Sequence, residues 1–406
     1  MKWIKKNNMD YKKLISNYGD TFYLLDSNKF KNNYIELKNS FAKIYDNFNI
    51  AYSYKTNYIP KLCKIINELG GYAEVVSEME LDLARKIRVD YNRIIWNGPI
   101  KNTDKLNEFL VNGGIVNIDN LKELYIIKDI LSKNKNTIYK LGVRCNYDVG
   151  DGVLSRFGFD VNSEDFNETI KFINNNENID FVSIQCHFAK RDITYCKNKI
   201  DGLLNIIDKY NLEPKIIDVG GGLYGKMEDS LKKQFDSEIP NYQDYANIIA
   251  NAVNKKFKNS KNKPLLFIEP GSALVGDCMK FISTIKSIKN IRGKYFATTT
   301  GSQKNISMQN INPPIEIIHM GNDLVKYKDL DFVGYTCIES DVLYHNYCGE
   351  LAEGDLLSIS NCGSYSIVMK PPFILPNFPI IDISNENIEL VKKQETFDDV
   401  FRTYIF

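Results

Sequence analysis

The stretch "NIAYSYKTNYIPKLCKIINELGGYAEVV" (Asn49–Val76) decides the fold, because a strand, a helix and a second strand follow one another within it. At its start, apolar and aromatic residues alternate with the small residues Ala51 and Ser53, which is the period of a β-strand. The next segment, "IPKLCKIINELG", has helical spacing and stops at Gly70. Two strands joined by a helix of this length predict a βαβ crossover and a parallel sheet.

The same alternation continues along the chain, with helical stretches between most of the strands. The predicted strands are "NIAYSY", "YAEVV", "RIIWN", "GIVNID", "IYKLGVRCN", "FVSIQCHFA", "KIIDVGG" and "PLLFIEPG". About eight such units in roughly 250 residues favour a (β/α)8 TIM barrel, and a doubly wound open sheet is the alternative. We therefore predict an α/β protein with the barrel over residues 27–278.

The character of the sequence changes near Gly276. Beyond this point helical periodicity fades, and short β-type runs such as "KFISTIKSI", "IEIIHM" and "DLLSIS" follow. The segment "DTFYLLD" (Asp20–Asp26) lies before the first barrel helix and is a candidate to pair with these strands. We predict a β domain, a sandwich or a barrel, formed by residues 1–26 plus 279–406.

The bulk composition excludes several classes of protein. The chain has 406 residues and a formal charge of +1, so no basic excess is available for a nucleic-acid partner. Its eight cysteines form no CxxC pair and its histidines number three, which makes a metal site unexpected. The N-terminus lacks the apolar region of a signal peptide, and no run approaches the length of a membrane span. These features predict a cytoplasmic protein that works without a membrane.

Several polar residues fall at the carboxyl ends of the predicted barrel strands, where active sites of such barrels lie. They are Lys55, Glu74, His187, Gly220, Gly221, Gly222 and Glu269. Each has a plain alternative, because a strand can end at a surface lysine or a glutamate, and a core can contain a histidine. The triplet in "GGGLYG" could be a tight turn without a ligand.

Taken together, these residues indicate pyridoxal 5′-phosphate as the cofactor. That cofactor needs a lysine for a Schiff base, an anion site for its phosphate and a partner for its ring nitrogen. A glycine turn presents backbone N–H groups to a phosphate. A carboxylate at the ring nitrogen keeps it protonated, which favours carbanion chemistry at the α-carbon of an amino acid.

At this point the chain resembles the fold-type III pyridoxal-phosphate decarboxylases, the family of diaminopimelate and ornithine decarboxylases. The resemblance runs through nearly the whole chain and rests on motifs in the family's order. They are "YSYKTN", "AEVVSEMEL", "NGPIK", "SRFGF", "CHF", "DVGGGLYG", "IEPG", "GYTCIESD" and "GDLLSISNCGSYS". It implies a barrel of the alanine-racemase type with a C-terminal β domain.

The resemblance also implies roles for individual residues in the barrel. Lys55 would be the Schiff-base lysine, Glu269 would pair with the pyridine nitrogen, and His187 would lie against the ring face. The remaining cofactor contacts implied by the resemblance are Glu74 near the ring oxygen, Arg156 behind the ring, Gly220, Gly221, Gly222 and Gly271 in the glycine-rich turns, and Tyr365 at the phosphate.

In the β domain, Cys337 would be the acid that returns a proton to the α-carbon of the quinonoid carbanion that remains after the loss of CO₂. Because this cysteine comes from the neighbouring subunit in the family, the resemblance implies a homodimer with two shared active sites. The plain alternative for Cys337 is a buried, small apolar side chain. Candidate substrate contacts are Ser272, Ile338, Glu339 and Asp341.

Three departures from the family pattern bear on the substrate. Ser272 stands where the family often has an arginine after "EPG", and "CHFAKRD" replaces "HxGS", so that Lys190 and Arg191 are candidate replacements for the missing cation. Ile338 stands where an acidic residue usually holds the substrate's distal amine. We therefore predict decarboxylation of an amino acid or an amino-acid conjugate.

The competing predictions are a decarboxylase of the diaminopimelate, ornithine or lysine type with an altered distal site, and an amino-acid racemase. Racemases of this fold typically have an arginine at the pyridine nitrogen, so Glu269 favours decarboxylation. A regulatory protein that holds pyridoxal phosphate is a third possibility, which the β domain and Cys337 oppose. A sugar-processing barrel would leave Lys55 and the glycine triplet unexplained.

Overall fold

The computed structural model describes residues 9–133, 136–308 and 311–406. The chain divides into two compact units. The barrel unit comprises Phe30–Lys226 and Ser237–Leu274, and the sheet unit comprises the described residues up to Lys29, Met227–Asp236 and Val275–Phe406. The domain limits predicted from the sequence stay a prediction, and the grouping of residues 227–236 with the sheet unit was not foreseen.

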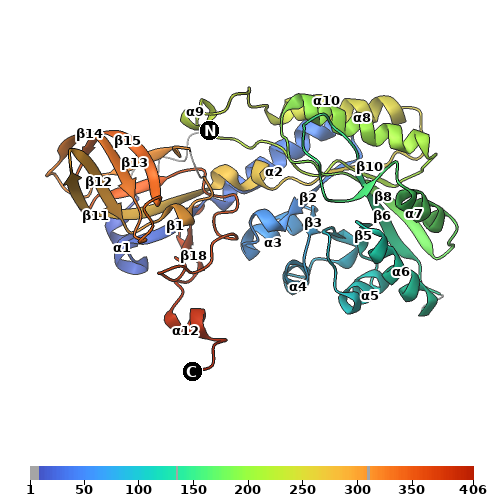
Figure 1. Cartoon of the computed structure of the whole chain (residues 1–406), viewed down its shortest axis with the longest axis horizontal. Coiled ribbons are helices and arrows are strands. Elements are labelled where there is room, and N and C mark those ends of the chain that lie inside the picture. The colour runs from blue at the N-terminus through green and yellow to red at the C-terminus, as the bar shows by residue number, and fades with distance from the viewer. Residues whose placement is uncertain (1–8, 134–135, 309–310) are drawn as a thin grey trace. The chain divides into compact units, whose positions relative to one another are not determined.

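Eight parallel strands close the barrel in the order β2-β3-β4-β5-β6-β8-β9-β10, and β10 pairs in turn with β2 (Figure 1). The strands are β2 (Phe48–Ser53), β3 (Tyr72–Val75), β4 (Ile94–Trp96), β5 (Ile115–Ile118), β6 (Tyr139–Asn146), β8 (Ile179–Gln185), β9 (Ile216–Asp218) and β10 (Leu265–Ile268), and the short β7 (Phe159–Asp160) pairs with β6. The predicted (β/α)8 barrel is confirmed, and the open-sheet alternative is excluded by the closure.

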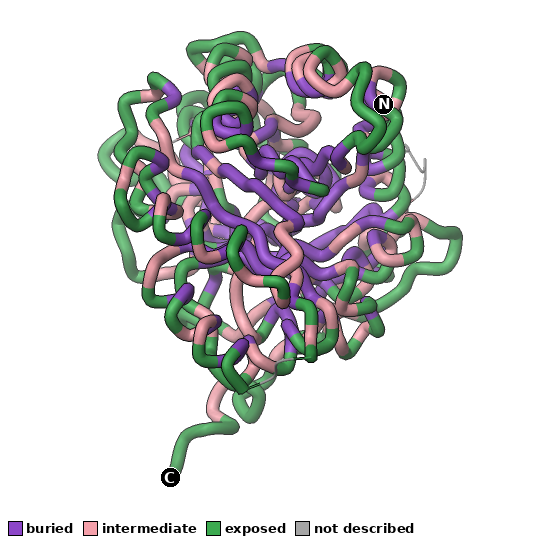
Figure 2. Tube along the Cα trace, turned by 90° about the vertical axis from the view of Figure 1, so that its right-hand side faces the viewer, coloured by how far each residue is buried: buried purple, intermediate pink, exposed green. Residues whose placement is uncertain are grey.

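Helices connect the strands, as the spacing of the apolar runs predicts. They are α2 (Ser27–Ala42), α3 (Pro60–Glu68), α4 (Glu78–Lys86), α5 (Thr103–Val111), α6 (Leu121–Lys133), α7 (Glu164–Asn174), α8 (Ile193–Lys209), α10 (Tyr242–Phe257) and α11 (Ser272–Val275), with the single turns η1 (Tyr54–Thr56) and η2 (Tyr91–Arg93). In Figure 2 the buried stretches, in purple, gather in the centre of the barrel, and exposed stretches surround them.

Local signals set where these helices begin. The side chain of Ser77 accepts the backbone N–H of Glu80 at the start of α4, whose first turn is acidic and therefore complements the helix dipole. Asn241 and Asp244 form a reciprocal capping box at the start of α10. Pro60 opens α3, where its missing N–H costs no hydrogen bond.

The sheet unit contains nine strands, and one of them, β1, comes from the part of the sequence that precedes the barrel (Figure 1). The strands are β1 (Thr21–Leu25), β11 (Met279–Ile291), β12 (Lys294–Thr299), β13 (Ile315–Ile318), β14 (Val325–Val333), β15 (Val342–Leu351), β16 (Leu356–Ile359), β17 (Ile380–Asp382) and β18 (Glu389–Lys392). β1 lies between β11, to which it is antiparallel, and β17, to which it is parallel. The predicted pairing of "DTFYLLD" with the C-terminal strands is confirmed.

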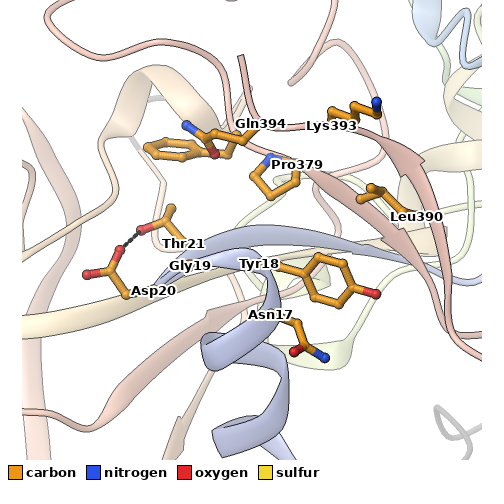
Figure 3. A pocket seen from close by; sticks show the side chains of 10 residues that line it. Asn17, Tyr18, Gly19, Asp20, Thr21, Pro379, Leu390, Lys393 and Gln394 are labelled. Carbon is orange, nitrogen blue, oxygen red and sulfur yellow. Dashed lines mark hydrogen bonds between the residues drawn. The ribbon is translucent and has the colours of Figure 1, made fainter. Parts of the chain in front are cut away.

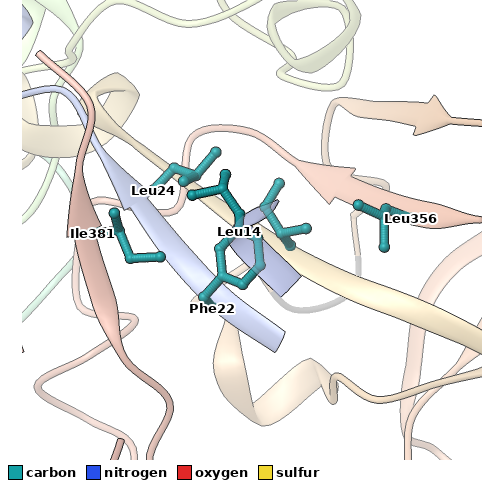
Figure 4. Close-up of a cluster of buried hydrophobic side chains, with 6 residues drawn as sticks. Leu14, Phe22, Leu24, Leu356 and Ile381 are labelled. Carbon is teal, nitrogen blue, oxygen red and sulfur yellow. The ribbon is translucent and has the colours of Figure 1, made fainter. Parts of the chain in front are cut away.

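Short helices complete the sheet unit: α1 (Tyr11–Tyr18), α9 (Asp229–Lys232), α12 (Phe397–Phe401), η3 (Gly276–Cys278) and η4 (Gln303–Asn305). Leu14 of α1 packs onto the sheet beside Phe22 and Leu24 of β1 (Figure 4). Leu356 and Ile381 extend the same buried cluster onto β16 and β17. The N-terminal segment is therefore held to the C-terminal strands by apolar burial as well as by hydrogen bonds.

The sheet unit also has a surface pocket of about 470 Å³ (Figure 3). Its lining consists of Asn17, Tyr18, Gly19, Asp20, Thr21, Phe378, Pro379, Leu390, Lys393 and Gln394. None of the predicted cofactor or substrate residues is among them. Across the described part of the chain, no helix is both long and apolar enough to span a membrane.

Candidate active site in the barrel

The candidate residues follow the carboxyl ends of neighbouring strands, because all eight barrel strands run in one direction. Lys55 lies in η1 directly after β2, and Glu269 directly follows β10. Gly220–Gly222 follows β9, and His187 follows β8. These four strands are consecutive around the barrel, so the side chains that were predicted separately belong to one face.

Inside the barrel, an apolar layer is covered by a polar layer. A buried cluster takes one residue from each of six strands, which fixes these residues inside the barrel: Ala51, Ile95, Ile115, Val182, Ile216 and Phe267. Since side chains alternate along a strand, the residue two positions later also points inward. Five cluster residues give the pairs Ala51 and Ser53, Ile95 and Asn97, Ile115 and Asn117, Ile216 and Asp218, and Phe267 and Glu269. Tyr72, which packs against the cluster, gives a sixth pair with Glu74. Strand β8 departs from this spacing, because its register shifts and Val182 is followed two positions later by Ile184.

Lys55 and Glu74 form an ion pair in this polar layer. The Lys55 Nζ lies 2.6 Å from Oε2 of Glu74, and the Ser53 hydroxyl donates to the same oxygen at 2.5 Å. The Glu74 side chain is 1 % exposed, whereas that of Lys55 is 32 % exposed. The buried carboxylate therefore orients an amine that stays accessible from the barrel mouth.

Asn97 connects this ion pair to the second glutamate. Its Nδ2 donates to Glu269 Oε1 at 2.5 Å and to Glu74 Oε1 at 3.2 Å, and its own Oδ1 accepts from Asn117 Nδ2 at 2.8 Å. Gln185 Nε2 reaches both oxygens of Glu269 at 3.4 Å. The two glutamates are thus held in one network of amide donors.

Burial changes the protonation of the carboxyl groups in this network. It raises the pKa of Glu269 well above its ordinary value, and the negative charges of Asp218 and Glu74 raise it further. Burial likewise raises the pKa of Asp218 to about 6. In the cofactor-free protein, Glu269 therefore keeps a proton to a much higher pH than an exposed glutamate does.

His187 is held as a neutral imidazole. Its Nδ1 accepts the backbone N–H of Gly221 at 3.0 Å, which places the ring proton on Nε2. Burial lowers the pKa of His187 well below its ordinary value, and the positive charges of Lys55 and Arg144 lower it further. The ring is therefore fixed in position by the glycine turn and carries no charge.

The glycine turn requires glycine at each of its positions. Gly220 and Gly222 have φ of +68° and +81°, the left-handed region that side chains disfavour. A Cβ at Gly220 would lie 2.3 Å from the carbonyl oxygen of Cys186, and one at Gly221 would lie 2.6 Å from that of Glu269. Close packing of the three strand ends therefore leaves no space for a side chain.

Gly271 has a similar constraint on the other side of Glu269. A Cβ at this position would lie 1.9 Å from Oγ1 of Thr56, the residue after Lys55. The backbone N–H of Ser53 donates to the Pro270 carbonyl at 3.3 Å. The "EPG" turn thus packs directly against the segment that carries the lysine.

Comparison with known proteins identifies the family. Residues 29–276 match the model of the pyridoxal-dependent decarboxylases, specifically their pyridoxal binding domain. The chain belongs to the pyridoxal-dependent decarboxylases. Its cofactor is pyridoxal phosphate, and its reaction class is decarboxylation of an amino acid.

Individual relatives of this decarboxylase resemble it over nearly its full length. The diaminopimelate decarboxylase of Aquifex aeolicus is 24 % identical over 95 % of this chain and 92 % of its own. The crystal structure of the Methanocaldococcus jannaschii diaminopimelate decarboxylase superposes with a TM-score of 0.86 at 23 % identity, covering 97 % of this chain and 94 % of that one. The arginine decarboxylase of Paramecium bursaria Chlorella virus gives a TM-score of 0.72 at 19 % identity, over 92 % and 99 %.

The residues of the decarboxylase's barrel fit the cofactor that the family implies. An accessible amine lies beside a buried carboxylate, and a second buried carboxyl group follows the adjacent strand. Any Cβ would fill the space beside the glycine turn. Without side chains, the backbone N–H groups of the turn can approach a phosphate closely. These are the groups that an aldehyde, a pyridine nitrogen and a phosphate require.

The loop of the decarboxylase that contains Cys337 lies in the sheet unit. Cys337, Ile338 and Glu339 are exposed, whereas Asp341 is 6 % exposed. The Asp341 carboxylate accepts from Thr336 Oγ1 at 2.6 Å, Ser302 Oγ at 2.9 Å and the backbone of residue 303 at 2.7 Å. These contacts give Asp341 a structural role in the loop, and its contact with substrate stays a prediction.

The remaining predicted residues lie at or near the surface of their own units. Arg156 is exposed, with its guanidinium carbon 4.1 Å from the centre of the Phe157 ring. Tyr365, in the sheet unit, is half-buried and has φ of +61°, a strained conformation that is often found at functional sites. Lys190 is exposed, and Arg191 lies over the ring of Tyr224 at 5.4 Å.

Sequence reasoning missed several members of the polar layer: Ser53, Asn117, Gln185 and Asp218. Each lies within a strand, where a polar residue is expected from ordinary alternation and does not by itself indicate a site. The signal that would have found most of them is the two-residue spacing from an inward apolar residue to the strand's carboxyl end. Applied to the predicted barrel, that spacing places Asn117 and Asp218 in the same layer as Glu74 and Glu269.

Proposed function

We propose that this decarboxylase acts at the α-carbon of an amino acid whose distal group is not a free ammonium, such as an acylated or otherwise conjugated diamino acid. The observation that carries the proposal is Ile338, which is exposed beside Cys337 at the position where the family usually has an acidic residue. A charge-assisted hydrogen bond contributes about 1.5–3 kcal/mol. The loss of this hydrogen bond lowers the preference for a substrate with a free distal ammonium by about tenfold or more.

Ser272 supports the same substrate class. It replaces the arginine that often follows "EPG", and it is half-buried next to Gly271. The substitution leaves a small hydroxyl where a long cation would stand. The resulting space and lower charge suit a substrate larger and less polar at its far end than a simple diamino acid.

Different residues of the chain have different roles in the proposed reaction. When bound, pyridoxal phosphate supplies an aldehyde and an electron-withdrawing ring. Lys55 would provide the amine that holds the aldehyde, and Glu269 would keep a proton at the ring nitrogen. Glu74 orients Lys55 through the 2.6 Å ion pair. His187 would lie against the ring. After CO₂ leaves, the Cys337 thiol gives its proton to the α-carbon.

A homodimer with shared sites is part of this proposal. Cys337 and Tyr365 both lie in the sheet unit, while the Lys55 network is complete within the barrel unit. In the proposed assembly, the sheet unit of one protomer supplies Cys337 and Tyr365 to the barrel of its partner. A cytoplasmic location also belongs to the proposal, and it is supported by eight free cysteines, which suit a reducing compartment.

The second candidate is diaminopimelate decarboxylation. It is favoured by the names of the curated relatives, of which the Aquifex aeolicus protein is one. Glu339 is exposed one residue beyond Ile338 and could hold a distal ammonium in its place. The family match favours decarboxylation over the racemase and regulatory alternatives.

A CO₂-release assay decides between the two substrate classes. The purified holoenzyme is incubated with diaminopimelate, ornithine and lysine, and with their N-acyl and citryl conjugates. We expect the highest kcat/KM for a conjugate. A kcat/KM for diaminopimelate above that of every conjugate would overturn the proposed substrate class and establish the second candidate.

Complementation tests the shared site. Lys55→Ala subunits, expected to be inactive, and Cys337→Ala subunits, expected to be strongly impaired, are unfolded, mixed and refolded together. If each site needs one residue from each protomer, the mixture regains activity, because a mixed dimer contains one intact site. A mixture as inactive as its components, in a preparation that forms mixed dimers, would exclude the sharing of these two residues.

A further inference from the structure

Lys199 is a buried lysine that the reaction does not use. It lies on α8, and the residue is 2 % exposed. Among the described residues, no carboxylate forms an ion pair with it. Lys101 provides the contrast, because its equally buried side chain pairs with Glu123 at 2.5 Å. A buried ammonium without an ion-pair partner is costly, so its presence calls for an explanation.

The Lys199 ammonium lies directly against the glycine turn. Its Nζ donates to the carbonyl oxygens of Gly221 at 3.3 Å and Phe188 at 3.1 Å. A Cβ at Gly222 would lie 2.9 Å from the same nitrogen. Lys199 therefore connects the turn after β9 to the loop after β8, in which His187 accepts the N–H of Gly221.

This contact fixes the direction of the next peptide N–H. A trans peptide is planar, and its C=O and N–H groups point in opposite directions. Because the Gly221 carbonyl points at Lys199, the N–H of Gly222 points away from it. Within the described chain no acceptor takes that N–H. The turn thus presents an unused donor on one side and holds a cation on the other.

We propose that Lys199 is the buried cation of the cofactor-phosphate site in this chain: it holds the Gly221–Gly222 peptide with its N–H toward the phosphate and supplies positive charge from behind the turn. The inference rests on pyridoxal-phosphate binding at Lys55. Lys199 acts here as a positioning residue. It compensates for Ser272, which stands in place of an arginine, and it does so from inside the barrel unit.

Two further observations agree with this assignment. Lys190 is exposed, and the Arg191 guanidinium lies over Tyr224, so neither of the cations first considered is buried against the turn as Lys199 is. Burial lowers the pKa of Lys199. A phosphate nearby favours the charged form and offsets that effect.

The test compares pyridoxal 5′-phosphate with pyridoxal, which lacks the phosphate. Dissociation constants for both are measured on cofactor-free wild-type protein and on Lys199→Met, from the absorbance change on adduct formation at Lys55. We expect the affinity for pyridoxal 5′-phosphate to fall by about tenfold and that for pyridoxal to change by less than about twofold. Lys197→Met is the matched control, because Lys197 lies on the same helix with its side chain 64 % exposed.

Equal losses for the two ligands would show a structural role alone and would overturn the proposal, as would two unchanged affinities. Lys199→Gln is the second variant, since its amide keeps a donor for the Gly221 carbonyl while it removes the charge. Failure of both neutral variants to fold with saturating pyridoxal 5′-phosphate would also overturn it. Failure of the cofactor assignment itself is distinct, because wild-type protein would then form no adduct with either ligand.

Discussion

The barrel mouth and the Cys337 loop differ in how far one chain completes them. In the barrel mouth, Lys55, Glu74, Asn97 and Glu269 are joined by hydrogen bonds, and three of the four are almost fully buried. In the loop, Cys337, Ile338 and Glu339 are exposed, and the buried Asp341 carboxylate accepts from Thr336 and from the backbone of residue 303. The difference teaches that the residues proposed to bind the cofactor are already joined in one network, whereas the residues proposed to choose the substrate are exposed.

The largest effect is expected in the barrel mouth, at Lys55. Lys55→Ala removes the amine that we propose holds the cofactor, so turnover should fall below detection and borohydride should trap no adduct. Lys64→Ala, an exposed change on the adjacent α3, should leave both unaffected. A trapped adduct at another lysine would refute the role of Lys55.

The next largest effect is expected in the loop. Cys337→Ala removes the proposed proton donor, so turnover should fall by about 10²- to 10⁴-fold while the Lys55 adduct still forms. Cys348 is the other exposed cysteine and gives the matched control, Cys348→Ala. Turnover equal to wild type, measured by CO₂ release and product analysis, would show that the loop takes no part in proton transfer.

A smaller effect tests how the loop selects the substrate. Ile338→Asp restores an acidic residue, so kcat/KM for a substrate with a free distal ammonium should rise by about tenfold. Glu339→Gln is the companion variant, because it lowers the same kcat/KM only if Glu339 already holds that ammonium. No gain from Ile338→Asp would place substrate selection elsewhere.

The smallest effect concerns the polar layer of the cofactor-free protein. Burial raises the pKa of Asp218 from 3.8 to about 6, so the folded state binds this proton more tightly than the unfolded state. The stability that this proton contributes is present below about pH 4 and is lost as pH rises through about 6. Asp218→Asn should therefore gain melting temperature relative to wild type between pH 4 and 7.

Thermal unfolding across that pH range provides the measurement. Asp229→Asn, at a side chain that is 86 % exposed, should track wild type at every pH. A constant difference between Asp218→Asn and wild type would show that Asp218 is already ionised in the fold at pH 4.

Most of the fold follows from the sequence because strand and helix periods alternate clearly. The barrel strands and the pairing of β1 with the C-terminal strands were both expected, and both are present. The grouping of residues 227–236 with the sheet unit was not expected. Tertiary contacts such as that between Gln234 and Asn312 determine it, and no local pattern reports them.

The site was predictable in part for the same reason. Lys55, His187 and Glu269 directly follow strands, so predicting the barrel was enough to gather them. Asn117, Gln185 and Asp218 lie inside strands and required the inward face of each strand to be known. The substrate is harder still to predict from the sequence. The side chains of Ile338 and Glu339, beside Cys337, are exposed, and the groups that they would contact lie outside this loop.

The pairing of β1 with β11 has a consequence for synthesis of the chain. Thr21 pairs with Ser283, roughly 260 residues later. At about 5–20 residues per second, a ribosome needs roughly 13–50 s to make the intervening chain. All five residues of β1 are buried in the finished protein, and for that interval they have no sheet to join. A nascent chain of this enzyme therefore carries an unpaired apolar strand while its barrel is being made, which makes it a natural client for chaperones.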